Sequence, residues 1–118
     1  MKYLLLLLTL ILFHTFSIAQ KFNSGTYTFN YCDLEYNRCL GTCKVVIEGD
    51  SITIYATKEL AGRITLIKEG DIIDQGIVLK HKSGKWIVGK IQKDKNAKDI
   101  GIEGPAIIDF KKKQYWTF

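Results

Sequence analysis

Three cysteines lie close together in the first half of the chain, and their number and spacing limit the chemistry available to them. Cys32, Cys39 and Cys43 form the pattern C-x6-C-x3-C. Because three is an odd number, at most one bridge can form within the chain and one thiol is left over. A structural zinc site needs four ligands, and no histidine accompanies this cluster in the sequence. The cysteines therefore predict one structural disulfide rather than a metal or redox centre.

The phase of the flanking strands favours one of the three pairings. Cys43 has the same parity as Val45 and Ile47, so we expect it to face the core. Cys32 has the parity of the polar residues before it, so we expect it to face solvent unless the strand bends. This phase favours a Cys32–Cys39 disulfide with Cys43 as a buried free thiol. The pairings Cys32–Cys43 and Cys39–Cys43 remain open.

Two segments match part of an ion-binding motif, and both lack a residue that the motif needs. Residues 84–90 match the first seven positions of a P-loop, but Ile91 stands where Ser or Thr would bind magnesium. No helix follows this segment to direct its N-terminus at a phosphate. Residues 94–105 resemble a calcium loop, but Lys98 takes a ligand position and Pro105 replaces the bidentate glutamate. We therefore predict no metal and no cofactor.

His81 is the one histidine with a place in the predicted domain, and a histidine could serve as the base of a hydrolase. No strained nucleophile turn such as G-x-S-x-G accompanies it. His81 alternates in phase with Ile77 and Leu79, which is typical of a half-buried histidine in a barrel strand. We expect no catalytic residue and no enzymatic activity, with a small hydrolase as the least favoured alternative.

Lysines dominate residues 80–98, where Asp94 is the one acidic residue. They are Lys80, Lys82, Lys85, Lys90, Lys93, Lys95 and Lys98. Such a surface suits an anionic glycan or a lipid headgroup. It contains no arginine, the usual residue for bidentate phosphate recognition, which argues against nucleic acid. The sequence therefore predicts a surface for an anionic partner, with a merely solvated face as the alternative.

The N-terminal segment has the pattern of a secretory signal peptide. Residues 1–19 combine a positively charged start, an apolar run and small residues before Gln20. The apolar run is shorter than the roughly 20 residues that a transmembrane helix needs. We expect cleavage between Ala19 and Gln20 and a mature domain over residues 20–118 without a transmembrane segment. The predicted location is extracytoplasmic, either periplasmic or secreted.

The elements that position these residues are short strands, because Ile, Val and Thr are frequent and turn signals recur about every ten residues. The predicted strands cover residues 26–31, 44–48, 51–57, 63–68, 72–82, 85–91, 106–110 and 114–118. Residues 58–62 could hold one helical turn, and Gly76 predicts a bulge or a bend at a barrel corner. Closure removes exposed edges, so we predict an all-β fold, a small antiparallel barrel of about eight strands. A two-sheet β-sandwich is the alternative.

The alternation of apolar residues predicts which side chains fill this barrel. The hairpin around residues 49–50 would bury Val45, Ile47, Ile52, Ile54 and Ala56. The strand over residues 63–68 would turn Ile64 and Leu66 inward. At the C-terminus, Trp116 and Phe118 would close the barrel beside Tyr27, Phe29 and Tyr31.

The overall plan resembles the periplasmic lysozyme-inhibitor barrels, and the predicted architecture is lipocalin-like or lysozyme-inhibitor-like. The matching local feature is Ser83-Gly84 in a hairpin turn, with the aromatic residue displaced to Trp86. The formal charge of +5 would disfavour a basic lysozyme as the partner. We therefore expect a non-catalytic protein that binds an anionic or small apolar partner. The alternative is a protein–protein module, such as a proteinaceous inhibitor or an envelope-associated factor.

Overall fold

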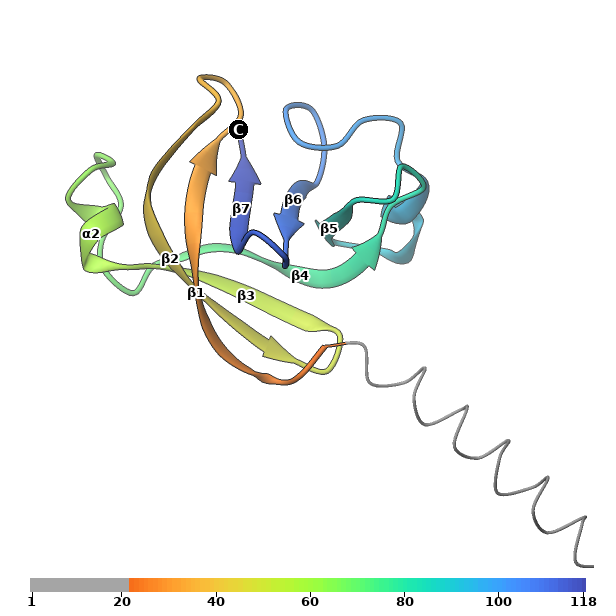
Figure 1. The fold of residues 1–118 in the computed structure, drawn as a ribbon, viewed down its shortest axis with the longest axis horizontal. Coiled ribbons are helices and arrows are strands. Elements are labelled where there is room, and N and C mark those ends of the chain that lie inside the picture. The colour runs from red at the N-terminus through yellow and green to blue at the C-terminus, as the bar shows by residue number, and fades with distance from the viewer. Residues whose placement is uncertain (1–21) are drawn as a thin grey trace, which may run out of the picture.

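Seven strands form a closed barrel in the computed structural model, which describes residues 22–118 (Figure 1). They are β1 (Gly25–Asp33), β2 (Arg38–Glu48), β3 (Ser51–Ala56), β4 (Ile72–Lys80), β5 (Trp86–Gly89), β6 (Ala106–Asp109) and β7 (Gln114–Thr117). The predicted all-β barrel is confirmed, with seven strands in place of about eight. The predicted signal peptide, residues 1–19, lies outside the described residues.

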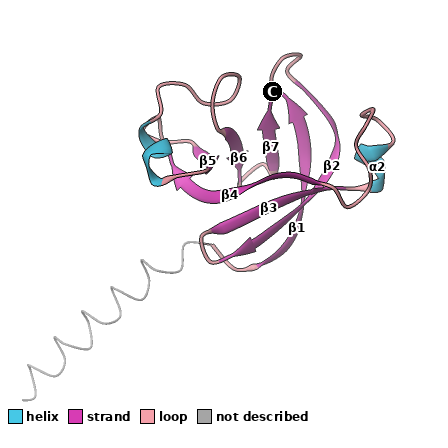
Figure 2. Cartoon of the chain, turned by 180° about the vertical axis from the view of Figure 1, so that it is seen from behind, coloured by secondary structure: helices cyan, strands magenta, loops and turns pink. Residues whose placement is uncertain are grey.

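Strands that follow each other along the chain pair antiparallel, and β7 closes the barrel by pairing parallel with β1. Two short helices interrupt the described strands: α2 (Lys58–Ala61) between β3 and β4, and the 3-10 helix η1 (Gln92–Asn96) between β5 and β6. They lie on opposite sides of the barrel (Figure 2). The helical turn predicted for residues 58–62 is therefore confirmed.

The β2–β3 hairpin has the predicted register and the predicted buried face. Val45 lies opposite Ile54 and Ile47 opposite Ile52, and all four side chains are buried, as is Ala56. Gly49 has a φ of 61° in the two-residue turn, a conformation that glycine adopts without a steric penalty. Apolar alternation on both strands and a glycine turn therefore agree on one register.

The strand predicted over residues 63–68 is wrong. This segment is an irregular loop in which Leu66 is 95% exposed and Ile64 is half-buried. The Ala56 amide donates to the Asp71 carbonyl at 2.8 Å, and the Gly70 amide donates to the Ala56 carbonyl at 2.9 Å. These bonds bring the end of β3 directly to the start of β4, so no ladder position is left for an additional strand between them.

β4 changes its pairing partner close to Gly76, where the sequence predicts a bulge or a bend. Its residues 72–77 pair with β3, whereas its residues 77–80 pair with β5. A Cβ atom at Gly76 would lie 2.1 Å from the carbonyl oxygen of Gly89. The glycine is therefore required by a close backbone approach between β4 and β5. The register shift of the β3–β4 ladder lies elsewhere, between Ile54 and Tyr55 of β3.

β7 lies beside β1 as predicted, but the aromatic residue that faces inward is different. Tyr115 is 1% exposed and its ring centroid lies 5.7 Å from that of Tyr31, whereas Phe118 is exposed. Trp116 points to the outer face, where it lies opposite Cys32. The predicted phase of β7 is thus wrong by one residue. The strand ends at Thr117, so Phe118 lies beyond it, and Tyr115 rather than Trp116 faces inward.

A second, smaller apolar layer lies outside the barrel. Val78 and Val88 belong to the main core, but their neighbours Leu79 and Ile87 are also buried while facing the opposite side. Residues 90–104 lie over this outer face, and we call them the cover segment. Gly101 of this segment lies so close to the outer face that an added Cβ atom would meet the side chain of Ile107. β5 is therefore buried on both faces.

Candidate functional site

The disulfide joins Cys32 and Cys39, and Cys43 is a buried free thiol, so the favoured pairing is confirmed. The expectation that Cys32 faces solvent is wrong, since it is fully buried. Cys32 nevertheless keeps the outward phase of β1, because Tyr31 lies opposite the inward-facing Tyr115 and Cys32 lies opposite Trp116, outside the main core. Cys32 is therefore buried on the outer face of the barrel, without a change in the phase of β1.

Cys43 lies on the inner face of β2, and burial raises the pKa of its thiol to about 12. A reactive cysteine requires a lowered pKa, so this thiol has the environment of a packing residue. Within residues 22–118, no group of three or more His, Cys, Asp or Glu side chains is arranged to hold a metal ion.

His81 fastens the cover segment to the barrel. Its ring is buried, with Nε2 2.7 Å from the Ala97 carbonyl and Nδ1 2.9 Å from Ser83 Oγ. The Ser83 amide also donates to Nδ1, so Nδ1 accepts and Nε2–H donates to Ala97. The sequence predicted a half-buried histidine on a barrel strand. In the structure His81 is buried just beyond β4, and both of its ring nitrogens form hydrogen bonds to the protein.

The two partial ion-binding motifs have structural roles. Trp86 to Gly89 is strand β5, as predicted for the P-loop-like segment. In the calcium-loop-like segment, Asp94 Oδ2 accepts hydrogen bonds from the Lys90 amide at 2.7 Å and the Ile91 amide at 3.2 Å. The Asp94 carboxylate therefore binds the backbone amides just before η1 instead of a metal ion.

All seven lysines of residues 80–98 have exposed side chains, but they do not form one uniform surface. The Lys82 amide donates to the Lys95 carbonyl, which places the β4–β5 turn beside the end of η1. Lys80 lies over the Trp86 ring, with its nitrogen 5.7 Å from the ring centroid. Lys90 instead binds Asp74 in an ion pair. The predicted lysine surface is therefore divided between a group near the β4–β5 turn and Lys90.

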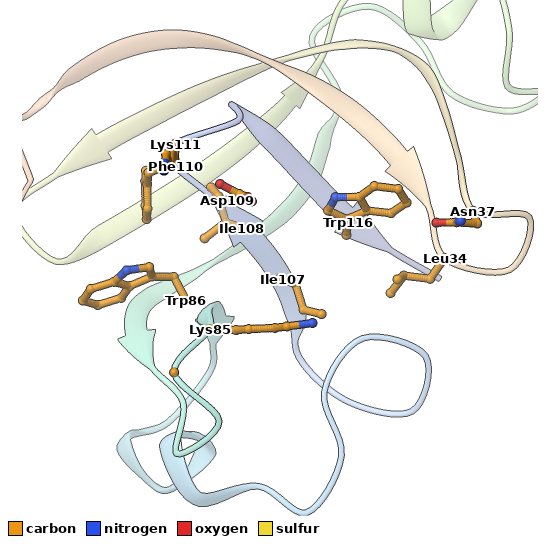
Figure 3. Close-up of a pocket in the computed structure, with 11 residues that line it drawn as sticks. Leu34, Asn37, Lys85, Trp86, Ile107, Ile108, Asp109, Phe110, Lys111 and Trp116 are labelled. Carbon is orange, nitrogen blue, oxygen red and sulfur yellow. The ribbon is translucent and has the colours of Figure 1, made fainter.

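A groove of about 580 Å³ lies beside the β4–β5 turn, and Figure 3 shows the side chains that line it. We call it the outer groove. Its lining comes from the β1–β2 turn (Leu34 and Asn37), the β4–β5 turn (Gly84 and Lys85), and the sheet and turn formed by Trp86, Ile107, Ile108, Asp109, Phe110, Lys111 and Trp116. Three separate parts of the chain therefore meet around it.

The outer groove combines apolar lining with lysines. Ile107 and Trp116 lie opposite each other in the β6–β7 ladder, and the Trp116 Nε1–H donates to Gln114 Oε1 at 3.2 Å. Lys85 extends toward Ile107 in Figure 3. Lys111 lines the same groove, and both lysine side chains are exposed. The arrangement can take an apolar body together with an acidic group.

A second cavity, of about 650 Å³, lies near the end of β5, and we call it the Asp74 pocket. The Asp74 carboxylate accepts from the Tyr115 hydroxyl at 2.7 Å and from the Lys90 ammonium at 2.5 Å. Burial raises the pKa of Tyr115, and the Asp74 charge and hydrogen bond raise it further. Burial also raises the pKa of Tyr31, which lines the same pocket.

The sequence prediction missed both cavities, and the reason differs between them. Ile107 and Trp116 are apolar residues on an outward face, a signal that alternation carries once the strand phase is known. Asp74 and Tyr115 lie on β4 and β7, Lys90 follows β5, and Asp74 is separated from Tyr115 by 41 residues. Only the barrel closure brings these three side chains together.

Within residues 22–118, no helix is both long and apolar enough to cross a membrane. Comparison with known proteins gave no match: no family model, no curated protein and no solved structure is significantly similar to this chain.

Proposed function

We propose that this chain is an extracytoplasmic, non-catalytic binding protein that holds an amphipathic anion in the outer groove. The observation that carries the proposal is an apolar lining with lysines at two places: Lys85 beside Ile107, and Lys111 beside Phe110 (Figure 3). An acyl or aromatic body would cover the apolar side chains, and its acidic group would reach a lysine ammonium. The volume of about 580 Å³ lies in the range of small-molecule sites.

The charge of the surrounding surface supports an anionic rather than a neutral ligand. Lys80 and Lys82 flank the β4–β5 turn that supplies Lys85 to the groove. Asp109 is the acidic residue of the lining, and its carboxylate accepts a hydrogen bond from the Lys112 amide at 2.9 Å. A positive local field would raise the concentration of an anion at the groove and speed its association.

The extracytoplasmic part of the proposal is supported by the disulfide and by the predicted signal peptide. Disulfides persist in oxidising compartments and are rare in the cytosol. A bridge that closes a loop as short as Cys32–Cys39 contributes about 2–3 kcal/mol on the chain-entropy view.

The experiment titrates the protein with decanoate, kept below its micelle concentration, and follows tryptophan fluorescence and amide NMR shifts. We expect binding that weakens with added salt, because the acidic group pairs with exposed lysines. The Lys85→Glu and Lys111→Glu variants should each weaken binding at least fivefold. The Ile107→Glu variant should abolish it, because a carboxylate would stand on the apolar lining.

Lys68→Glu is the matched control, since Lys68 is an exposed lysine in the β3–β4 loop and does not line the groove. It has the same charge change as the two groove variants. Equal losses for Lys68→Glu and Lys85→Glu would mean that the net charge, and not the groove, controls binding. Absence of any shift with decanoate at millimolar concentration would refute the proposed ligand class.

A further inference from the structure

The Asp74 pocket is separate from the outer groove, and the two cavities share no lining residue. Its polar centre is the Asp74 carboxylate, whose side chain is 15% exposed. One oxygen accepts from the Tyr115 hydroxyl, and the other accepts from the Lys90 ammonium and from the Gln75 amide. The carboxylate is thus held in one orientation by three different donors.

The Lys90 ammonium has two acceptors in this pocket. It donates to Asp74 Oδ1 and to the carbonyl oxygen of Gln75. At this point β4 pairs with β3, while its pairing with β5 begins only at Ile77. β5 therefore does not pair with β4 at Gln75, and the Lys90 ammonium binds the Gln75 carbonyl instead.

The Lys90 side chain is held less firmly than the Asp74 carboxylate. It is 60% exposed, and it reaches the pocket from beyond the end of β5. An exposed ion pair of this kind is worth at most about a fivefold factor in an equilibrium. Another ammonium group could therefore displace Lys90 at small cost.

The rest of the Asp74 pocket suits the body of such an amine. Its lining includes apolar and aromatic side chains, namely Tyr31, Ile73, Val88, Pro105, Tyr115 and Phe118. Tyrosine rings attract a cation positioned over their faces. The second carboxylate in the lining, Asp94, adds negative charge once Lys90 has left.

We propose that the Asp74 pocket binds a primary amine with an apolar body, and that the Lys90 ammonium occupies the position of the ligand's amine. This site is independent of the proposed groove, because it requires a ligand of the opposite charge. The ligand's three N–H donors would replace Lys90 at Asp74 and Gln75, and its body would lie against the accessible lining residues Tyr31, Ile73 and Phe118.

The test uses 2-phenylethylamine as the probe and amide NMR shifts of the protein as the readout. We expect the Lys90→Met variant to bind about fivefold more tightly than the unchanged protein, because the internal competitor is gone. Asp74→Asn should weaken binding at least tenfold. Lys93→Met is the matched control, because Lys93 is an exposed lysine that does not line the pocket, and it should change nothing.

Two ligand controls keep the test independent of whether Asp74→Asn folds. 3-Phenylpropionate, which has a similar body and the opposite charge, should not bind in this pocket. The N-trimethyl derivative of the amine, which lacks N–H donors, should bind at least fivefold more weakly to Lys90→Met. Equal binding of all three probes, or no gain on removing the Lys90 ammonium, would overturn the proposal.

Discussion

The two long connections of the barrel differ in how they are held, and the difference runs against their composition. The β3–β4 loop, residues 57–71, contains Ile64, Leu66 and Ile67, yet Leu66 is almost fully exposed. The cover segment is mostly polar, yet it lies on the outer face of the sheet and buries Leu79 and Ile87. Within the β3–β4 loop only Leu60 of α2 is fully buried, so apolar content does not decide which part of a connection packs on the barrel.

Hydrogen bonds from neighbouring strands account for the difference. Two carbonyls of the cover segment accept hydrogen bonds from residues just after β4. The Ala97 carbonyl accepts from the His81 ring, and the Lys95 carbonyl accepts from the Lys82 amide. The β3–β4 loop is joined to β3 through Ala56 at its base, and α2 is joined to β2 by Glu59, whose carboxylate accepts from the Thr42 amide. Between α2 and Asp71, the backbone amides of the β3–β4 loop donate to acceptors within the loop or to Ala56 at its base.

The largest effect concerns Cys43, which lies opposite Ala56 at the base of the β3–β4 loop. Because burial raises its thiol pKa from 9.0 to about 12, the thiolate fraction at pH 8 falls by about a thousandfold. We expect labelling of the native protein by a thiol reagent to be slower than that of a free peptide by at least this factor. The rate should rise with pH toward 12, where the thiolate forms.

The measurement is labelling followed by mass spectrometry, with the urea-unfolded protein as the reference. Fast labelling of the native protein at pH 8 would mean that the base of the β3–β4 loop opens and admits solvent to the barrel interior. The comparison between the two connections would then need revision, because the loop would be loose at its root as well.

The second prediction compares one isoleucine beneath the cover segment with one in the β3–β4 loop. Ile87→Ala should lower the free energy of unfolding by about 3 kcal/mol, because the side chain is fully buried and its loss leaves a cavity. Ile64→Ala, with the same change of volume at a half-buried position, should cost less than about 1 kcal/mol. Urea denaturation measures both, and equal losses would remove the distinction between the connections.

The third prediction removes the bridge that fastens the cover segment. His81→Ala should lower the free energy of unfolding by about 2 kcal/mol, because the Ala97 carbonyl and the Ser83 amide lose a partner. Hydrogen exchange should accelerate for amides of residues 92–98, while labelling of Cys43 should stay slow. Lys82→Ala is the control, since Lys82 contacts the cover segment through its backbone.

The fold followed from the sequence where local signals agreed with one another. Around Gly49 the alternation of apolar residues, the turn glycine and the β-branched residues all favour one hairpin, and the structure contains it. Over residues 63–68 alternation was the only signal, and it predicted a strand where the β3–β4 pairing left no position for one. The parallel pairing of β7 with β1 is likewise a consequence of closure, which alternation within a strand does not record.

The sites were harder to predict than the fold, because their members lie on different strands. The disulfide pairing was accessible, since the parity of Cys43 relative to Val45 places its side chain in the core. The lysine pattern indicated a positive surface, but only the folded barrel separates Lys90 from the others and places it on Asp74. A list of charged residues along the chain cannot distinguish an exposed lysine from one that occupies a pocket.

The smallest effect separates backbone strain from apolar exposure at Leu66. This residue has a φ of 73°, in the left-handed region that bulky side chains disfavour. Leu66→Gly should raise the free energy of unfolding by about 0.5 kcal/mol, since relief of the strain exceeds the entropy that glycine adds to the unfolded chain. Leu66→Ala, which removes the exposed apolar surface but keeps Cβ, should give no such gain. If urea denaturation shows that both variants lose stability, the Leu66 side chain stabilises the β3–β4 loop, and the two connections differ less than their hydrogen bonds indicate.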